Sequence, residues 1–406
     1  MLPRGKIDVG WSDLLFGMGQ CLRPRDRDEA QRRVEAAWSC AGDALACLSV
    51  RSGFDALLAA LAYPPGSEVL MSALTIRDMV RIVEHHGLVP IPIDLDVETL
   101  SITPEGLERA AGPRTKALVV AHVFGSRMPL DDVIACARRH GLLVVEDCAQ
   151  TYVGSGYPGH PDADVCMFSF GPIKTNTALG GGILRIKDAA LLAKTRAIQE
   201  RYPVQSRWRY LRRLGQYAGI KLVSIPVLFG LFATVCRRMG RTHDQVISSA
   251  VRGFPGPDFF TRIRHQPSAP LLALLERRLT RFDPARIERR IAVAKRAIAL
   301  MPGIPRPGER ARAHFHWVFP IQSACPDQLM ERLWSAGFDA TRGASSLTVV
   351  PPPRDRPELA ATQAQQAMQR VLYLPVYSGV RDRDLQKLAR VVTSLALHVD
   401  NAPING

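Results

Sequence analysis

The stretch from residue 116 to 187 decides the fold: it contains K-A-L-V-V-A-H-V-F-G (116–125), L-L-V-V-E-D-C-A-Q (142–150) and V-C-M-F-S-F-G-P-I-K-T-N-T-A-L-G-G-G-I-L-R-I (165–186). Each segment holds a short apolar run of strand length, bounded by turn residues. Such runs are typical of buried strands in a mostly parallel sheet. Helical segments alternate with predicted strands along the chain, which favours right-handed crossovers in an α/β fold. We therefore expect functional groups at the strand ends.

An acid and a lysine follow two of these runs. Asp147 follows the apolar run 142–145 after one intervening residue, at the expected carboxyl end of a strand, where open α/β sheets bind ligands. Lys174 stands in a loop after the next run. This pair suits pyridoxal phosphate: the lysine holds the cofactor as a Schiff base, and the acid keeps the pyridine nitrogen protonated. Of the eight lysines, only Lys174 lies in a Gly-rich loop after a buried strand.

The same residues resemble a known family, the DegT/DnrJ/StrS-type aminotransferases of fold type I, which aminate keto-sugars attached to nucleotides. The shared motifs are E-D-C-A-Q (146–150), F-S-F-G-P-I-K (168–174) and G-G-G (180–182). Supporting matches, among them S-G-F-D-A-L (52–57) and L-Y-L-P-V-Y-S-G (372–379), run from about residue 45 to the C-terminus. The resemblance implies a large domain with a mostly parallel seven-stranded sheet between helices, and a smaller C-terminal α/β domain.

We divide the chain accordingly into three parts. Residues 1–45 form an N-terminal helical segment, residues 46–300 the large cofactor-binding domain, and residues 301–406 the small domain. Within the large domain, residues 201–255 are an insertion that departs from the family.

The resemblance assigns four site residues around the cofactor ring and phosphate. Lys174 would be the Schiff-base lysine and Asp147 the partner of the pyridine nitrogen. Gln150 would lie beside the ring near its phenolic oxygen, and Ser169 would hydrogen-bond the phosphate. The backbone at Ser52, Gly53 and Phe54, opening a helix, would complete the phosphate cradle, since a helix start favours an anion.

Three positions depart from the family pattern. Family members usually carry an aromatic residue after the threonine of the loop at Thr75, and it stacks on the cofactor ring; here the residue is Ile76. An aliphatic side chain covers the ring by apolar contact but lacks the stacking contribution of about 1 kcal/mol. Phe54 stands where the family often has threonine. Arg264 aligns with an asparagine that contacts phosphate across the dimer; it is either a phosphate ligand or a solvated arginine.

Composition places limits on the setting. A chain of 406 residues with 47% hydrophobic content buries a large core. Residues 1–20 show no sustained apolar run of a signal peptide. The eight cysteines form no C-x-x-C pair. We therefore expect a reduced, cytoplasmic enzyme without a metal site.

The net charge of +15 comes largely from arginine. A basic surface favours nucleic acid, an anionic membrane or a phosphorylated substrate. Because the chain shows no helix-turn-helix and no aromatic and basic RNA platform, we expect no nucleic-acid partner.

The insertion allows two interpretations. Residues 201–217 are basic and aromatic, and residues 222–236 are apolar without a charge. Fifteen residues broken by Pro226 and Gly230 are too short for an ordinary membrane span. The segment is either a helical subdomain that covers the active site or dimer contact, or an interfacial element that touches lipid headgroups at the inner face of the membrane.

Histidines offer weaker candidates. His122 ends a predicted strand and is either near the site or a satisfied core histidine. The adjacent His85 and His86 do not share a helix face, which argues against a metal pair. His314 and His316 alternate on a predicted strand (314–321), and we interpret them as strand-face residues.

We predict a homodimeric aminotransferase with active sites at the subunit boundary. It would take an amino group, from glutamate by family analogy, and pass it to a ketone or aldehyde, a nucleotide-linked keto-sugar by the same analogy. One alternative keeps the cofactor but changes the reaction to a dehydration or lyase step. Another is a non-catalytic binding or regulatory protein on the same scaffold, which Ile76 and Phe54 would allow.

Overall fold

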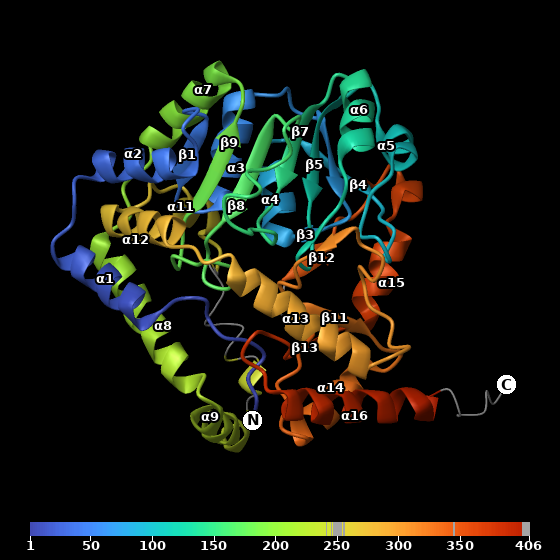
Figure 1. Ribbon diagram of the computed structural model, residues 1–406. Coiled ribbons are helices and arrows are strands. Elements are labelled where there is room, and N and C mark those ends of the chain that lie inside the picture. Colours follow the sequence, from blue (N-terminus) through green and yellow to red (C-terminus); the bar gives the residue numbers. More distant parts are fainter. Residues whose placement is uncertain (241, 245, 247–253, 255, 344–345, 400–406) are drawn as a thin grey trace.

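A computed structural model describes residues 1–240, 242–244, 246, 254, 256–343 and 346–399 (Figure 1). Its centre is a seven-stranded sheet with the strand order β1-β9-β8-β7-β5-β2-β4. The strands are, in chain order, β1 (Ala44–Cys47), β2 (Glu68–Ser72), β4 (Val89–Ile93), β5 (Thr115–Ala121), β7 (Leu143–Asp147), β8 (Val165–Ser169) and β9 (Gly182–Ile186).

The sheet is mostly parallel. The pairs β4 with β2, β2 with β5, β5 with β7 and β7 with β8 are parallel, whereas β9 runs antiparallel to both β8 and β1. The carboxyl ends of all strands but β9 therefore meet at one edge. The predicted fold class, with its seven strands, is confirmed.

Helices cover both faces of the sheet, because neighbouring strand residues point to opposite faces and both sets are apolar. On strand β5, Ala117 and Val119 belong to one core, and Leu118 and Val120 to the other. The first core is closed by α3 (Val50–Leu61), α4 (Arg77–His85), α7 (Ala189–Glu200) and α11 (Phe259–Ile263). The second is closed by α1 (Trp11–Leu22), α2 (Arg27–Trp38), α5 (Pro104–Ala110), α6 (Asp131–Arg139), α8 (Arg207–Val223) and α12 (Ala269–Thr280).

The C-terminal part has a third core, which lies below the main sheet in Figure 1. Antiparallel strands β11 (Phe319–Gln322) and β13 (Val371–Leu374) pack with α13 (Ala285–Leu300), α14 (Pro326–Ser335) and α16 (Asp382–Val399). Since Val293 and Ala297 of α13 belong to this core, the helix joins it to the rest. The domain boundaries remain predictions.

Short strands join the two parts. The C-terminal β10 (Ala313–His314) pairs with β6 (Ser126–Arg127), and β12 (Leu347–Val349) pairs with β3 (Leu74–Ile76). The 3-10 turn η1 (Pro357–Leu359) and α15 (Thr362–Arg370) follow β12.

The described part of the insertion is helical. It forms α8 and α9 (Pro226–Arg238), which lie along one side of the molecule (Figure 1). Among the described residues, no single helix is long and apolar enough to cross a membrane; α8 and α9 together meet that length and composition but are bent by 99°. Residues 241, 245, 247–253 and 255 of the predicted insertion lie outside the described residues.

Candidate active site

The predicted site residues gather at the carboxyl edge of the sheet. Asp147 is the last residue of β7 and Ser169 the last of β8, and these two strands are parallel neighbours. Lys174 follows Ser169 in the loop that leads to β9. Because β1 also ends at this edge, the start of α3 lies there too.

Asp147 is a buried carboxyl group. Its Oδ1 accepts a hydrogen bond from the backbone N–H of Ala149 at 2.9 Å, which fixes the side chain at the strand end. Burial raises the pKa of Asp147 above its ordinary value, and the N–H of Ala149 and the positive charge of Lys174 oppose the shift. A carboxyl group in such surroundings is suited to share a proton with a basic ring nitrogen.

The Lys174 amine is desolvated and lies against an aromatic ring. Its Nζ is 4.3 Å from the centroid of the Trp317 ring. Burial lowers the pKa of Lys174 to about 8, although the negative charge of Asp147 acts in the opposite direction. Near neutral pH a useful fraction of this amine is therefore unprotonated and nucleophilic.

The loop that carries Lys174 is held from three sides. The indole N–H of Trp317 donates to the carbonyl of Ile173 at 3.1 Å. Arg290 of α13 donates to Thr175 Oγ1 at 3.0 Å and to the carbonyl of Phe315 at 2.7 Å. The N-terminal segment contributes Asp8, whose carboxylate accepts from the N–H of Asn176 at 2.8 Å. These contacts fix the position of the lysine.

The helix start that we predicted at Ser52 lies earlier in the chain. Helix α3 begins at Val50, and Ser49 caps it by accepting from the N–H of Ser52 at 3.2 Å. The N–H of Gly53 donates to the carbonyl of Ser49 at 3.0 Å. In a helix that starts here, the N–H groups left for an anion are those of the first two residues, Val50 and Arg51. The sequence analysis placed this start too late because it overlooked Ser49 as the cap.

Gly53 and Phe54 face the core rather than the strand edge. A Cβ at Gly53 would lie 2.4 Å from Leu184 Cδ1, so glycine lets α3 pack closely on β9. The Phe54 side chain is fully buried among core residues. The predicted phosphate contact of these two residues stays a prediction.

The other predicted cofactor contacts lie around the same edge. Gln150 is buried, and its Oε1 accepts from the N–H of Phe124 at 2.8 Å. Ser169 is half-buried, with its Oγ 3.5 Å from the N–H of Gly171. Ile76 is the last residue of β3, opposite Leu347 in β12, and is half-buried. The roles of these residues remain predictions.

Arg264 is engaged within its own chain. Its Nε and Nη2 donate to the two oxygens of Asp55 at 2.9 and 3.0 Å. Asp55 is fully buried in α3 and also accepts from the Tyr202 hydroxyl at 3.1 Å. Burial opposes ionisation of Asp55, but the hydrogen bonds of His86 and Arg264 lower its pKa to about 2. A bidentate pair of this kind holds the guanidinium in place, and the predicted phosphate contact of Arg264 stays a prediction.

Sequence reasoning missed Arg51. It is the second residue of α3, and its charge acts on the pKa values of both Asp147 and Lys174. Its Nε donates to Asp78 of α4 at 2.5 Å, which ties together the starts of the two helices. The available signal was its position directly before S-G-F (52–54).

His122 is a satisfied core histidine. It is buried, with Nε2 2.8 Å from Glu146 Oε1, and Nδ1 accepts from the N–H of Met128 at 3.3 Å. Because both ring nitrogens have partners, His122 holds neighbouring segments together and is not free to reach a ligand.

The predicted strand over 314–321 is wrong. It is divided into β10 and β11 by a turn in which His316 has a φ of +48°. The turn packs closely against Gly125: a Cβ at Gly125 would lie 2.4 Å from the backbone nitrogen of Trp317. This break directs Trp317 toward the lysine.

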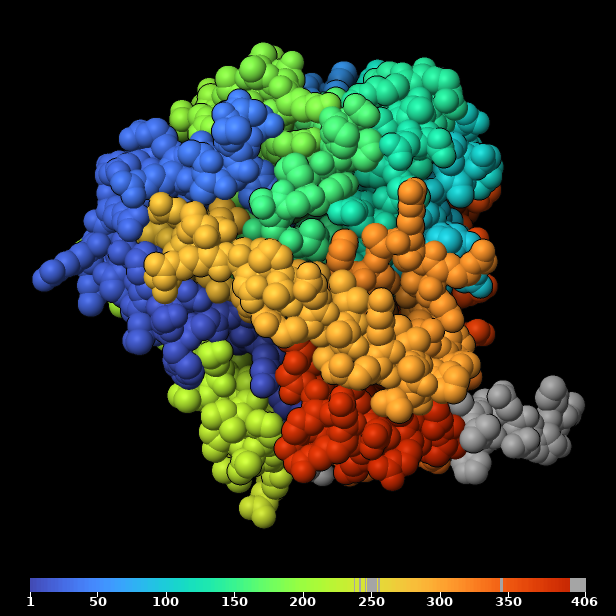
Figure 2. All heavy atoms as spheres, in the orientation of Figure 1, coloured from blue at the N-terminus to red at the C-terminus, as the bar shows by residue number. Residues whose placement is uncertain are grey.

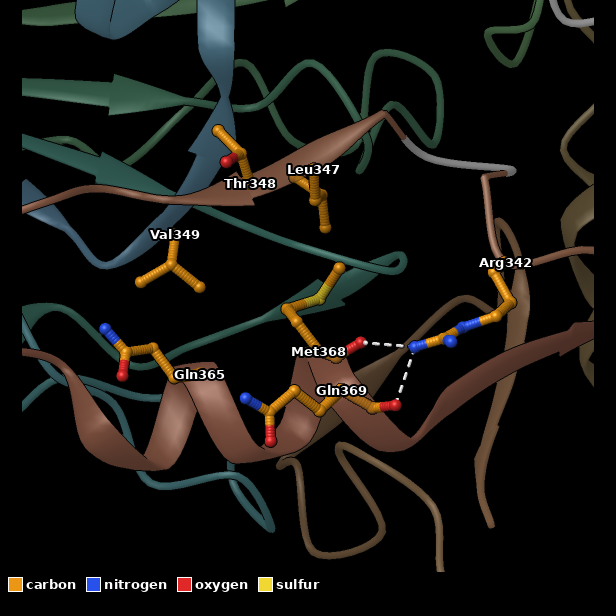
Figure 3. A pocket seen from close by; sticks show the side chains of 7 residues that line it. All are labelled: Arg342, Leu347, Thr348, Val349, Gln365, Met368 and Gln369. Carbon is orange, nitrogen blue, oxygen red and sulfur yellow. Dashed lines mark hydrogen bonds between the residues drawn. The ribbon is translucent and has the colours of Figure 1, made fainter. Parts of the chain in front are cut away.

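A separate cavity of about 380 Å³ lies between β12 and α15 (Figure 3). Arg342 closes one side by donating to the carbonyls of Met368 and Gln369. The residues that line this cavity include none of the predicted site residues. We therefore place the candidate site at the sheet edge.

The residues at the sheet edge fit pyridoxal phosphate. An amine of lowered pKa suits its aldehyde, a buried carboxyl group suits its pyridine nitrogen, and a helix start beside Arg51 suits its phosphate. Arg51 at the start of α3 and Asp147 at the end of β7 lie at the same sheet edge, and the charge of Arg51 acts on both Asp147 and Lys174.

Comparisons with known proteins agree with this arrangement. The chain is 34% identical to GDP-perosamine synthase of Caulobacter vibrioides over 159 residues, which is 38% of this chain and 43% of that protein. It is 37% identical to UDP-N-acetyl-3-dehydro-alpha-D-glucosamine 3-aminotransferase of Acidithiobacillus ferrooxidans over 155 residues, 36% of this chain and 42% of that protein. The matches thus span less than half the length of these curated relatives.

Solved structures share the fold along nearly the whole chain. The aminotransferase TlmJ from Streptoalloteichus hindustanus has a TM-score of 0.69 at 19% identity, covering 98% of this chain and 100% of that one. The aminotransferase from Psychrobacter cryohalolentis has a TM-score of 0.68 at 18% identity, covering 98% and 99%.

The family model of the DegT/DnrJ/EryC1/StrS aminotransferases matches residues 29–221, a range that contains Asp147, Lys174 and the start of α3. Over this range the chain is similar to the DegT/DnrJ/EryC1/StrS aminotransferase family.

Proposed function

We propose that the protein is a pyridoxal phosphate-dependent aminotransferase that moves an amino group from glutamate to the carbonyl of a nucleotide-linked keto-sugar. The observation that carries this proposal is the Lys174 amine, with a pKa of about 8, beside the buried Asp147 carboxyl group at the ends of adjacent strands. The family match over residues 29–221 supports it.

Bound pyridoxal phosphate supplies an electron-accepting ring. Lys174 would hold the cofactor covalently, and its amine, when free, would carry the proton between the two carbons that exchange it. An amine with a pKa of about 8 suits both directions of this transfer. Asp147 would keep a proton on the ring nitrogen, and Trp317 lies against the amine, with its ring centroid 4.3 Å from Nζ.

Other groups of the chain orient the cofactor. The N–H groups of Val50 and Arg51, the Arg51 guanidinium and the Ser169 hydroxyl would bind its phosphate. Gln150 uses its amide oxygen for Phe124, which leaves its NH₂ group to hold the phenolic oxygen of the ring, as it would in the proposed complex.

The acceptor class comes from the relatives. The names of two relatives contain a GDP-linked and a UDP-linked sugar. A nucleoside diphosphate brings two phosphates, which suit a chain whose net charge is +15.

Reduction with borohydride tests the covalent role of Lys174. We expect the protein with pyridoxal phosphate to show a visible absorbance band, and reduction to leave the cofactor on the peptide that contains Lys174, as mass spectrometry identifies. Lys174→Ala abolishes the band, whereas Lys187→Ala, which changes an exposed lysine after β9, keeps it. Labelling of a different lysine would contradict the proposal.

The same band separates the alternatives. A band that shifts when glutamate is added, with 2-oxoglutarate as product, supports transamination. A band that glutamate leaves unchanged favours a dehydration or lyase reaction. No band at any cofactor concentration favours a binding protein.

We further propose a cytoplasmic homodimer with its active sites at the subunit boundary, in peripheral contact with the inner face of the membrane through residues 201–236. The dimer rests on the family resemblance. The membrane contact rests on the composition of that segment.

A further inference from the structure

Helix α9 presents an apolar stripe to solvent. Val227, Leu231, Val235 and Met239 follow one another at intervals of four residues and are all exposed, Val227 by 80%. The opposite side of the helix is fixed: Phe229, at 4% exposure, lies edge-on to His243, which in turn pairs with Asp339 at 3.0 Å. The stripe is thus an outward face of a packed helix.

Helix α1 extends this surface, although the sequence analysis did not link it to the insertion. Trp11, Leu15 and Leu22 share one exposed face of α1, and Leu15 is 67% exposed. Helix α1 packs along α8, and Lys221 near the end of α8 lies over the Trp11 ring at 5.9 Å. Figure 2 shows the blue α1 next to the yellow-green α8 and α9 along one side of the molecule. We call the exposed apolar residues of α1, α8 and α9 the apolar face.

The apolar face is bordered by positive charge. Residues 201–240 contain seven arginines, one lysine and no acidic residue. Arg209 and Arg212 of α8 and Arg238 of α9 are exposed, and none of them has an ion pair with a described residue. Trp208, exposed between Arg207 and Arg209, adds an aromatic ring of the kind that favours the membrane interface.

We infer that the apolar face, α1 included, docks on an anionic lipid bilayer, with the stripe at the headgroup boundary and the arginines on lipid phosphates. The inference deepens the proposed membrane contact and rests on it, but it does not depend on the chemistry of Lys174. Charge complementarity decides the occupant: a second copy on the same face would bring the basic residues of two chains together, whereas an anionic bilayer neutralises them.

Co-sedimentation of the full chain with vesicles tests the inference. The probes are vesicles of phosphatidylcholine alone and vesicles of phosphatidylcholine and phosphatidylglycerol in equal parts. We expect binding to the anionic vesicles, weakened by salt. Leu231→Glu on α9 and Leu15→Glu on α1 should each lower the partition coefficient by about tenfold, because each buries a charge in the interface. Leu300→Glu, an exposed leucine at the end of α13, is the matched control and should bind like the wild type.

Three results would overturn the inference. One is that the wild type does not bind anionic vesicles, and another is that Leu231→Glu and Leu15→Glu bind them as the wild type does. The third is self-association of the wild type through this face. It would be seen as a larger species in sedimentation velocity that Leu231→Glu dissociates, with neither the wild type nor any variant binding vesicles. The absorbance of the bound cofactor, measured in parallel, reports separately on the proposed chemistry and on correct folding of each variant.

Discussion

A buried reactive group lowers the free energy of unfolding, and this loss can be measured at Lys174. The amine loses its proton near pH 8 in the folded protein but near 10.5 when unfolded. Below pH 8 both states are charged and the folded state bears the full cost of burial; the cost disappears as the pH rises from 8 to 10.5. We predict that Lys174→Met stabilises the cofactor-free protein by about 2 kcal/mol at pH 7, and by much less at pH 10.5.

Urea unfolding of wild type and variant at both pH values measures this difference. Lys187→Met serves as the control, since this lysine is exposed and should give no comparable gain at pH 7. An equal gain from Lys174→Met at the two pH values would show that burial does not lower the pKa of this amine.

At the level of elements, the approach of β9 to α3 sets the shape of the phosphate end of the site. A Cβ at Gly182 would lie 2.6 Å from the Val50 nitrogen and 2.7 Å from the Ser49 carbonyl carbon, both backbone atoms that cannot move aside. A Cβ at Gly180 would meet only side chains, at 3.4 Å or more. We predict that Gly182→Ala destabilises the protein by about 2 kcal/mol or more and weakens cofactor binding.

Thermal unfolding and titration with pyridoxal phosphate measure the two effects, with Gly180→Ala as the matched variant from the same G-G-G motif (180–182). If Gly180→Ala and Gly182→Ala behaved alike, the close approach of β9 to the start of α3 would not be the reason for glycine at residue 182.

For the whole molecule, the proposed dimer and the apolar face must be separate surfaces. We predict that light scattering after size exclusion gives twice the mass of one chain, and that Leu231→Glu leaves this mass unchanged. A single-chain mass for the wild type would contradict the dimer. A dimer lost in Leu231→Glu would instead place the subunit contact on α9.

Local pattern alone was enough for the main sheet and the two reactive groups. Apolar runs with turn residues predicted the strands β5, β7 and β8, and the position of Asp147 after one run and Lys174 after the next predicted their shared edge. Such features depend on neighbours in the chain, so a sequence expresses them directly. Thr75 was predicted to lie in a loop, but Leu74–Ile76 form strand β3, which pairs with β12.

The sequence by itself determined the fold class, the strand-end placement of Asp147 and Lys174, and the unusual composition of residues 201–236. Only the tertiary structure decided what depends on contacts between distant segments: the ion pair of Arg264 with Asp55, the turn that brings Trp317 over Lys174, and the union of α1 with α8 and α9 in one apolar face. The physical reason is that these contacts depend on long-range packing, which leaves no periodic signal in the chain.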